Sequence, residues 1–276
     1  MKADTRILLY DDYCPLCTWY SGIFVKSGLL KPENRIPFSK ADIEILTTID
    51  IEKGKDEIPL FDTKTQTTLY GIDALLEILG QKNSVIKLIG NFKPIKWVLQ
   101  KFYKFISYNR KVIVARKCGT GSFDCSPTFN VRYRVLFMAT FFVFNSIMLF
   151  PLHNILLRNL SFYHLSFTQL QEAHLVFVFT NCMIAASLKR KKAIDYLGQI
   201  NMLALITILL LVPLLITKGR VAGIEWIVVF YLISLTAFII NEYFRRMKYA
   251  NILLKHKTIV VINLFCLAAF LGYVFH

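Results

Sequence analysis

Long stretches without charge dominate the second half of this chain. Residues 135–150 contain no charged side chain, and the apolar character continues toward Leu157. About 20 apolar residues are enough for a helix to cross the hydrocarbon layer of a membrane. Similar stretches follow at 197–217, 224–240 and 258–275, and a shorter one at 173–188, whose helix could extend back through Leu170. The sequence therefore predicts an all-α transmembrane domain of about five spans over residues 135–276.

The composition agrees with a membrane protein, since 55% of the residues are hydrophobic and the mean hydropathy is +0.48. The net charge of +15 attracts either nucleic acid or an anionic membrane surface. No basic-aromatic motif of a known nucleic-acid reader is present, which argues against nucleic acid as a partner. The predicted partner is the lipid bilayer.

The basic residues alternate between the predicted loops. They gather before the first span (Arg132, Arg134), after the second (189–192) and after the fourth (245–257), whereas the loops after spans one and three carry few. Lys and Arg concentrate in cytoplasmic loops. We therefore expect a multi-pass protein of the inner or plasma membrane, with the N-terminal domain cytoplasmic and His276 outside. No signal peptide is visible at the start of the sequence.

The first half of the chain has a mixed α/β pattern, with short apolar runs between charged and turn-forming residues. The expected elements are strand 6–10, helix 17–26, strand 35–38, helix 39–49, strands 58–61 and 67–70, and helix 72–79. This βαβαββα order is that of a thioredoxin-like domain. We expect such a domain at residues 1–117, followed by a cysteine-containing linker at 118–134.

Two cysteines, Cys14 and Cys17, lie two residues apart between the first predicted strand and the first predicted helix. A thiol at a helix N-terminus has a lowered pKa, because the unpaired N–H groups and the helix dipole stabilise the thiolate. Pro15 suits the first helical turn. The pair is predicted to be a redox-active dithiol with Cys14 as the nucleophile. Two buried thiols and half of a zinc site are the alternatives.

A zinc site lacks further ligands, because Cys118 and Cys125 are separated by six residues rather than the two to four of structural sites. No metal and no dissociable cofactor are expected. The Cys118–Cys125 pair could serve as a redox relay for Cys14 and Cys17, or could be two incidental thiols.

Asp11 precedes the cysteine pair and has two credible roles. Its carboxylate could accept a proton from the resolving thiol Cys17, or it could brace the turn. Asp11 and Asp12 also oppose ionisation of Cys14 by like-charge repulsion.

The segment Tyr10–Cys17 resembles the signature of the DCC family of thiol-disulfide oxidoreductases, Asp-x-x-Cys-x-x-Cys, with Asp11, Cys14 and Cys17 at the matching positions. Asp12 stands where the family usually has glycine. Segments 71–79 and 103–110 are also similar, so the resemblance covers roughly residues 5–117. It implies disulfide exchange with thiol- or disulfide-bearing protein substrates. The thioredoxin-like order also places Ile58 and Pro59 at the start of the third strand, where such proteins have a substrate-binding loop with a cis peptide bond.

Two other features leave alternatives open. The apolar stripe at positions 95, 98, 99, 102, 105 and 106 predicts an amphipathic helix. This helix packs on the sheet with its lysines in solvent or presents the lysines to anionic lipid headgroups, and both hold if the domain lies against the bilayer. Four asparagines inside the predicted spans are most simply interhelical hydrogen-bond formers: Asn145, Asn181, Asn241 and Asn263.

Two other functions compete with the oxidoreductase. The first is a non-enzymatic membrane scaffold whose thioredoxin-like module binds a partner. The second is a transporter or quinone-linked enzyme regulated by the thiol domain, although few charges lie in the predicted spans.

Overall fold

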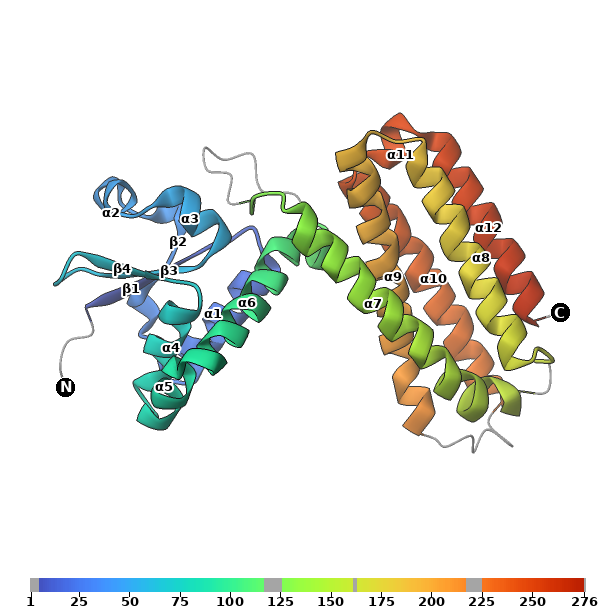
Figure 1. Cartoon of the computed structure of the whole chain (residues 1–276), viewed down its shortest axis with the longest axis horizontal. Coiled ribbons are helices and arrows are strands. Elements are labelled where there is room, and N and C mark those ends of the chain that lie inside the picture. The colour runs from blue at the N-terminus through green and yellow to red at the C-terminus, as the bar shows by residue number, and fades with distance from the viewer. Residues whose placement is uncertain (1–4, 117–125, 161–162, 217–224, 276) are drawn as a thin grey trace. The chain divides into compact units, whose positions relative to one another are not determined.

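The computed structural model describes residues 5–116, 126–160, 163–216 and 225–275. The chain divides into two compact units, residues 1–133 and 134–276. The first contains a small mixed sheet with helices, and the second is all-helical (Figure 1). The predicted fold class, an α/β domain followed by an all-α domain, is confirmed.

The sheet of the N-terminal unit has the strand order β2-β1-β3-β4. Its strands are β1 (Arg6–Tyr10), β2 (Arg35–Pro37), β3 (Pro59–Asp62) and β4 (Thr67–Tyr70). β1 is parallel to β2 and antiparallel to β3, which is antiparallel to β4. Parallel neighbours need a crossover connection, and α1 (Pro15–Lys26) supplies it between β1 and β2. The order of strands and helices agrees with the thioredoxin-like expectation.

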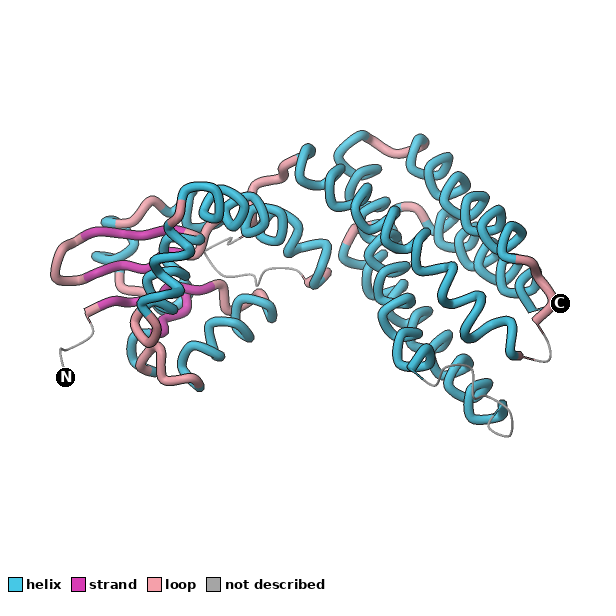
Figure 2. The backbone as a smooth tube through the Cα atoms, turned by 60° about the horizontal axis from the view of Figure 1, so that its bottom comes forward, coloured by secondary structure: helices cyan, strands magenta, loops and turns pink. Residues whose placement is uncertain are grey.

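Alternate side chains of β1 enter two different cores, as the period of a strand requires. Leu8 packs in a cluster with Phe24 of α1 and Ile78 of α4 (Ile72–Gly80). Leu9 packs in a second cluster with Ile45 of α2 (Ile43–Thr48). The helices therefore cover both faces of the sheet (Figure 2).

The predicted helix 39–49 is divided in the structure. A 3-10 turn at Phe38–Lys40 is followed by α2 and then by α3 (Ile51–Asp56). The side chain of Asp50 accepts a hydrogen bond from the Lys53 N–H and starts α3 as its N-cap. Two further helices complete the unit, α5 (Ser84–Asn91) and α6 (Lys93–Val114).

The described part of the C-terminal unit consists of helices, most of them long. They are α7 (Val131–Pro151), α8 (Phe167–Ala186), α9 (Arg190–Ile216), α10 (Glu225–Tyr249), α11 (Ile252–Lys255) and α12 (Lys257–Phe275), with α7 continued by π and 3-10 turns to Asn159. α9 packs against α8 and α10, and α12 packs against α8 (Figure 1).

Three segments in the described part of the chain are long and apolar enough to cross a membrane: Val131–Asn159, Arg190–Leu215 and Trp226–Tyr249. α12 is apolar over the shorter range Lys257–Tyr273, and α8 begins with a polar half that contains Gln169, Gln171 and Glu172. The chain is therefore a candidate membrane protein. The count of five spans stays a prediction.

Buried polar side chains form hydrogen bonds between the helices of this unit. Tyr196 of α9 is fully buried and donates a hydrogen bond of 2.7 Å to Asn181 of α8. Asn263 of α12 donates to Tyr196 at 2.8 Å and to Tyr243 of α10 at 3.0 Å. The interhelical role predicted for Asn181 and Asn263 is therefore observed.

The other two asparagines behave differently. Asn145 is buried, but its Oδ1 accepts no hydrogen bond from the described residues. Asn241 is exposed. The apolar pattern placed all four in helices, but it did not distinguish inward positions from outward ones.

Candidate active site

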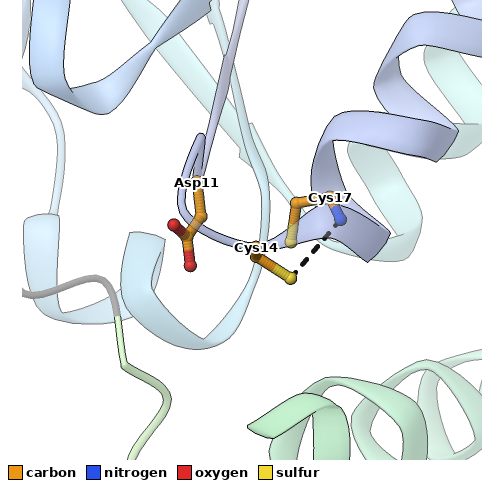
Figure 3. Close-up of side chains that lie close together, drawn as sticks. All are labelled: Asp11, Cys14 and Cys17. Carbon is orange, nitrogen blue, oxygen red and sulfur yellow. Dashed lines mark hydrogen bonds between the residues drawn. The ribbon is translucent and has the colours of Figure 1, made fainter. Parts of the chain in front are cut away.

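The turn after β1 positions the first two site residues. Asp11 follows the last residue of the strand, and its Oδ1 accepts a hydrogen bond of 3.0 Å from the backbone N–H of Tyr13. The Cys14 N–H donates to the Asp11 carbonyl at 3.2 Å. Pro15 then starts α1, where its missing N–H costs nothing. This turn leads the chain from the sheet directly into Cys14 (Figure 3).

Cys14 is the N-cap residue of α1, and its Sγ accepts a hydrogen bond of 3.4 Å from the Cys17 N–H. The ligand atoms of Asp11, Cys14 and Cys17 lie within 4.8 Å of one another, and Figure 3 shows the three side chains gathered at the start of the helix. Both cysteines are free thiols. The structure thus brings together the three residues predicted to be catalytic.

The two thiols differ in acidity. The pKa of Cys14 is lowered to about 6, chiefly because the Cys17 thiol donates a hydrogen bond to its sulfur. The Cys17 backbone N–H and Arg110 lower it further, against burial and Asp11. The pKa of Cys17 is raised, because its proton is held by Cys14 and because burial disfavours its thiolate. The site therefore favours a thiolate at Cys14 and a protonated thiol at Cys17.

Arg110 is a site residue that the sequence analysis did not single out. It lies on α6, is 7% exposed, and its Nη2 lies 3.7 Å from Asp11 Oδ2. The same nitrogen donates a hydrogen bond of 2.7 Å to the Lys55 carbonyl, which fixes the guanidinium in place. Burial disfavours its charge, but the neighbouring Cys17 and Cys14 outweigh this and raise the Arg110 pKa. Arg110 is therefore a permanent positive charge beside both thiols.

Other residues of α6 fasten this helix to the N-terminal unit. The Asn109 side chain is fully buried and donates hydrogen bonds to the carbonyl of Phe105 within α6 at 2.8 Å and to that of Tyr133 at the start of α7 at 3.1 Å. The Tyr103 hydroxyl accepts a hydrogen bond of 2.8 Å from the Ile58 N–H. Tyr103 and Arg110 belong to the segment 103–110 that resembles the family, and this resemblance was the only sequence signal for Arg110.

The two oxygens of the Asp11 carboxylate differ in their hydrogen bonding. Oδ1 braces the turn, whereas Oδ2 accepts no hydrogen bond from the described residues. Burial raises the Asp11 pKa, and the charges of Arg110 and Lys111 oppose this rise. Asp12 is oriented differently, because its Oδ2 accepts a hydrogen bond of 2.8 Å from the Ser39 hydroxyl. Asp12 Oδ1 accepts no hydrogen bond from the described residues either, but Asp12 is not in the cluster with the two cysteines. Within that cluster, Oδ2 of Asp11 is the carboxylate oxygen left for proton exchange.

Asp11, Cys14 and Cys17 are close enough together to act as metal ligands. However, Arg110 already provides a positive charge beside them, which repels a cation and stabilises a thiolate. The electrostatics therefore fit a dithiol better than a metal centre. Cys118 and Cys125, predicted as a redox relay, lie outside the described residues.

The peptide bond between Ile58 and Pro59 is trans, so the predicted cis bond is wrong. Pro59 is already the first residue of β3 and pairs with Tyr70 of β4. The Ile58 N–H donates to Tyr103, and its carbonyl accepts from the Gly71 N–H at 2.9 Å. Both backbone groups of Ile58 are therefore used within the domain. The role of these two residues in substrate binding stays a prediction.

Residues 8–116 match the family model described as DCC1-like thiol-disulfide oxidoreductase. The resemblance predicted from the Asp-x-x-Cys-x-x-Cys motif is thereby confirmed for the N-terminal unit. No curated protein and no solved structure matches the chain significantly.

Proposed function

We propose that the DCC1-like thiol-disulfide oxidoreductase domain at residues 8–116 carries out disulfide exchange for a membrane-anchored protein. The observation that carries this proposal is the position of Cys14. It is the N-cap of α1, has a pKa lowered to about 6, and lies beside Cys17 and Asp11. At pH 7 a thiol with this pKa is about nine-tenths ionised, and the thiolate is the attacking species.

In the first step the Cys14 thiolate attacks one sulfur of a substrate disulfide. A mixed disulfide forms between Cys14 and that sulfur, and the other substrate sulfur leaves as a thiolate. Cys14 and Cys17 are only 4% and 3% exposed, whereas the adjacent Pro15 is exposed. The substrate therefore approaches over Pro15 and displaces the side chains that cover Cys14.

In the second step Cys17 resolves the mixed disulfide. Asp11 Oδ2 takes the Cys17 proton, and the Cys17 sulfur attacks the Cys14 sulfur. The bond between Cys14 and the substrate breaks, and the second substrate sulfur leaves and takes the proton from Asp11. The first substrate thiolate takes a proton from water, so the substrate leaves as a dithiol after gaining two electrons, and the domain is left with a Cys14–Cys17 disulfide. Another dithiol or thiol reductant must reduce this disulfide before the next cycle.

The free carboxylate oxygen and the raised Asp11 pKa support this proton transfer. A carboxyl whose pKa lies above its ordinary value is a stronger base once it is ionised. Arg110 acts through its positive charge. It favours the thiolate at Cys14, and it compensates the negative charge of the buried Asp11 carboxylate.

We also propose that the C-terminal unit anchors this domain in a cell membrane with the thiols on the cytoplasmic side. The three apolar helices and the alternation of Lys and Arg between loops support this arrangement. Membrane-impermeant labelling of a C-terminal tag on intact cells tests the orientation. Labelling is expected, and a tag accessible only after the cells are permeabilised would contradict it.

The decisive experiment for the activity is trapping with a Cys17→Ser variant of the full chain. This variant can form the mixed disulfide but cannot resolve it, so adducts that dithiothreitol releases are expected to accumulate on Cys14. A Cys14→Ser variant should give no adduct, and Cys182→Ser, which removes an exposed thiol of the C-terminal unit, should behave like the wild type. Full cellular function of Cys14→Ser would favour the non-enzymatic scaffold instead.

A further inference from the structure

The helix α5 and the first half of α6 present an apolar surface that nothing in the described part of the N-terminal unit covers. Leu88 is 76% exposed, Phe102 63%, Phe92 61%, Trp97 61%, Val98 55% and Ile89 51%. We call this surface the basic-aromatic face and define it by these six residues and the exposed lysines among them, Lys82, Lys87, Lys93 and Lys101.

The amphipathic stripe is only partly used for packing. Positions 95, 98 and 102 are exposed, whereas positions 99, 105 and 106 are half-buried. Hydrogen bonds of Tyr103, Ser107 and Arg110 attach the helix to the unit, and an ion pair between Lys96 and Asp73 attaches its first half. The exposed positions of the stripe are therefore available to something other than the core.

The charged residues of this surface are basic. No acidic residue occurs between Glu77 and Asp124 in the sequence. Among the lysines of this region, Lys87, Lys96 and Lys104 pair with acidic groups, Glu77, Asp73 and Glu57 respectively. Lys82, Lys93 and Lys101 make no ion pair with the described residues, and Lys101 lies over the Trp97 ring at 5.8 Å. The face therefore offers positive charge next to large apolar side chains.

An amphipathic helix with lysines beside Trp, Phe and Leu is the type that binds in the interface of a bilayer. Its apolar side chains enter the boundary of the acyl chains, and its lysines reach anionic headgroups. A folded protein partner would have to supply both an apolar groove and a cluster of carboxylates. A chain with membrane-crossing segments always has a lipid surface near it, so lipid is the occupant that the charge and the context both favour.

We propose that the basic-aromatic face of α5 and α6 binds the anionic headgroup surface of the membrane that holds the protein. This contact is independent of the proposed disulfide exchange, because the thiols are not part of the face. Trp97 and Arg110 are separated by roughly 20 Å along α6 at 1.5 Å per residue. The first half of the helix thus contacts lipid, while the second half contributes Arg110 to the site.

The test uses the full chain in lipid nanodiscs and the fluorescence of one tryptophan. The substitutions Trp19→Phe and Trp226→Phe leave Trp97 as the single tryptophan, and both replaced side chains are exposed, at 65% and 85%. Lipids with brominated acyl chains quench a tryptophan that enters the bilayer. We expect strong quenching of Trp97 in discs that contain phosphatidylglycerol, and weak quenching in discs of phosphatidylcholine alone.

A matched reporter lies on the other face of the sheet. Ile43 of α2 is 80% exposed, and Ile43→Trp combined with Trp97→Phe in the same background moves the single tryptophan there. This reporter is expected to remain unquenched in both kinds of disc. Equal quenching at the two positions would overturn the proposal, because it would show no preference for the basic-aromatic face.

The lysines are tested by neutralisation. The double substitution Lys93→Gln and Lys101→Gln should lower the equilibrium ratio of lipid-bound to lipid-free protein face about 25-fold, at roughly fivefold for each lysine near an anionic surface. The control pair Lys40→Gln and Lys64→Gln removes the same charge from exposed positions elsewhere in the unit and should change nothing. Unchanged quenching after the first pair would overturn the role of the lysines.

A second measurement needs no substitution. Lys93 and Lys101 of the wild-type chain should react several-fold more slowly with an amine-acylating reagent in anionic discs than in neutral discs.

A water-soluble quencher, applied to the variant with Trp97 as its single tryptophan, tests for a protein partner. If neither this quencher nor the brominated lipids lowered the fluorescence of Trp97, the face would be covered by protein, from a second copy or from elsewhere in this chain. That outcome would also overturn the proposal.

Discussion

Each unit of this protein contains a buried arginine beside a carboxylate, and the pairs Arg246–Glu242 and Arg110–Asp11 differ in how completely they are hydrogen-bonded. Arg246 of the helical unit is 1% exposed, donates to Glu242 at 2.8 Å and donates to Gln199 at 2.7 Å. Arg110 of the N-terminal unit lies 3.7 Å from Asp11, whose Oδ2 accepts no hydrogen bond from the described residues.

The difference separates a structural ion pair from a reactive one. Close hydrogen bonds hold the Arg246–Glu242 charges in fixed positions, so neither group is available for proton transfer. The looser Arg110–Asp11 pair leaves an acceptor oxygen beside two thiols and supplies positive charge to a thiolate. We therefore expect substitutions in the first pair to change stability and substitutions in the second pair to change chemistry.

The largest expected effect is on the stability of the helical unit. Glu242→Gln removes the carboxylate that pairs with both Arg245 and Arg246 and leaves a buried positive charge uncompensated. Breaking such a pair costs about 3–5 kcal/mol. Denaturant unfolding in detergent measures this loss. Lys248→Gln, which removes one charge from an exposed position of the same helix, is the control and should cost less than about 0.5 kcal/mol.

The second prediction concerns Asp11→Asn. Asparagine can still accept the Tyr13 hydrogen bond, so the turn should persist, but the proton acceptor for Cys17 is lost. Turnover should fall about 100-fold, the size of a general-base contribution, and the mixed disulfide should accumulate. Because Asp11 raises the Cys14 pKa, the same variant should ionise Cys14 at lower pH. Unchanged turnover would contradict the role of Asp11 as proton acceptor, and a higher alkylation midpoint would contradict its effect on the Cys14 pKa.

A smaller effect is expected from Tyr196→Phe in the polar network of the helical unit. The substitution removes the hydroxyl that links Asn181 to Asn263. Interhelical hydrogen bonds in membrane proteins contribute about 0.6 kcal/mol each on average, so the loss should be roughly 1 kcal/mol. The same unfolding experiment measures it. A loss as large as that of Glu242→Gln would show that the neutral network, rather than the ion pair, holds the helices together.

The smallest effect concerns the charge of Arg110. In the wild type, the rate of Cys14 alkylation by iodoacetamide should rise with pH around a midpoint of about 6, because only the thiolate reacts. Arg110→Gln removes a charge that lowers this pKa, so the midpoint should move upward and the rate at pH 6 should fall at least about twofold. Arg110→Lys keeps the charge and should shift the midpoint less. An unchanged midpoint in Arg110→Gln would show that the guanidinium does not act on the thiol.

The local part of the site could be predicted from sequence because it depends on neighbouring residues. A strand, two thiols separated by two residues, and a proline in the first helical turn suffice to place Cys14 at a helix N-terminus. Arg110 could not be predicted in this way, because its contact with Asp11 joins segments far apart in the chain. The trans bond at Pro59 could likewise not be predicted, because tertiary context selects the isomer of an X–Pro bond.

The sequence by itself determined that the chain has a dithiol-bearing α/β half and an apolar helical half, since periodicity and hydropathy act over short distances. It also determined that residues 95–106 form an amphipathic helix. Only the tertiary structure decided which side of that helix meets the unit, which asparagines face inward, and which arginine faces the thiols. These outcomes depend on packing between distant segments, because a one-dimensional pattern defines an apolar or polar face but not the surface that contacts it.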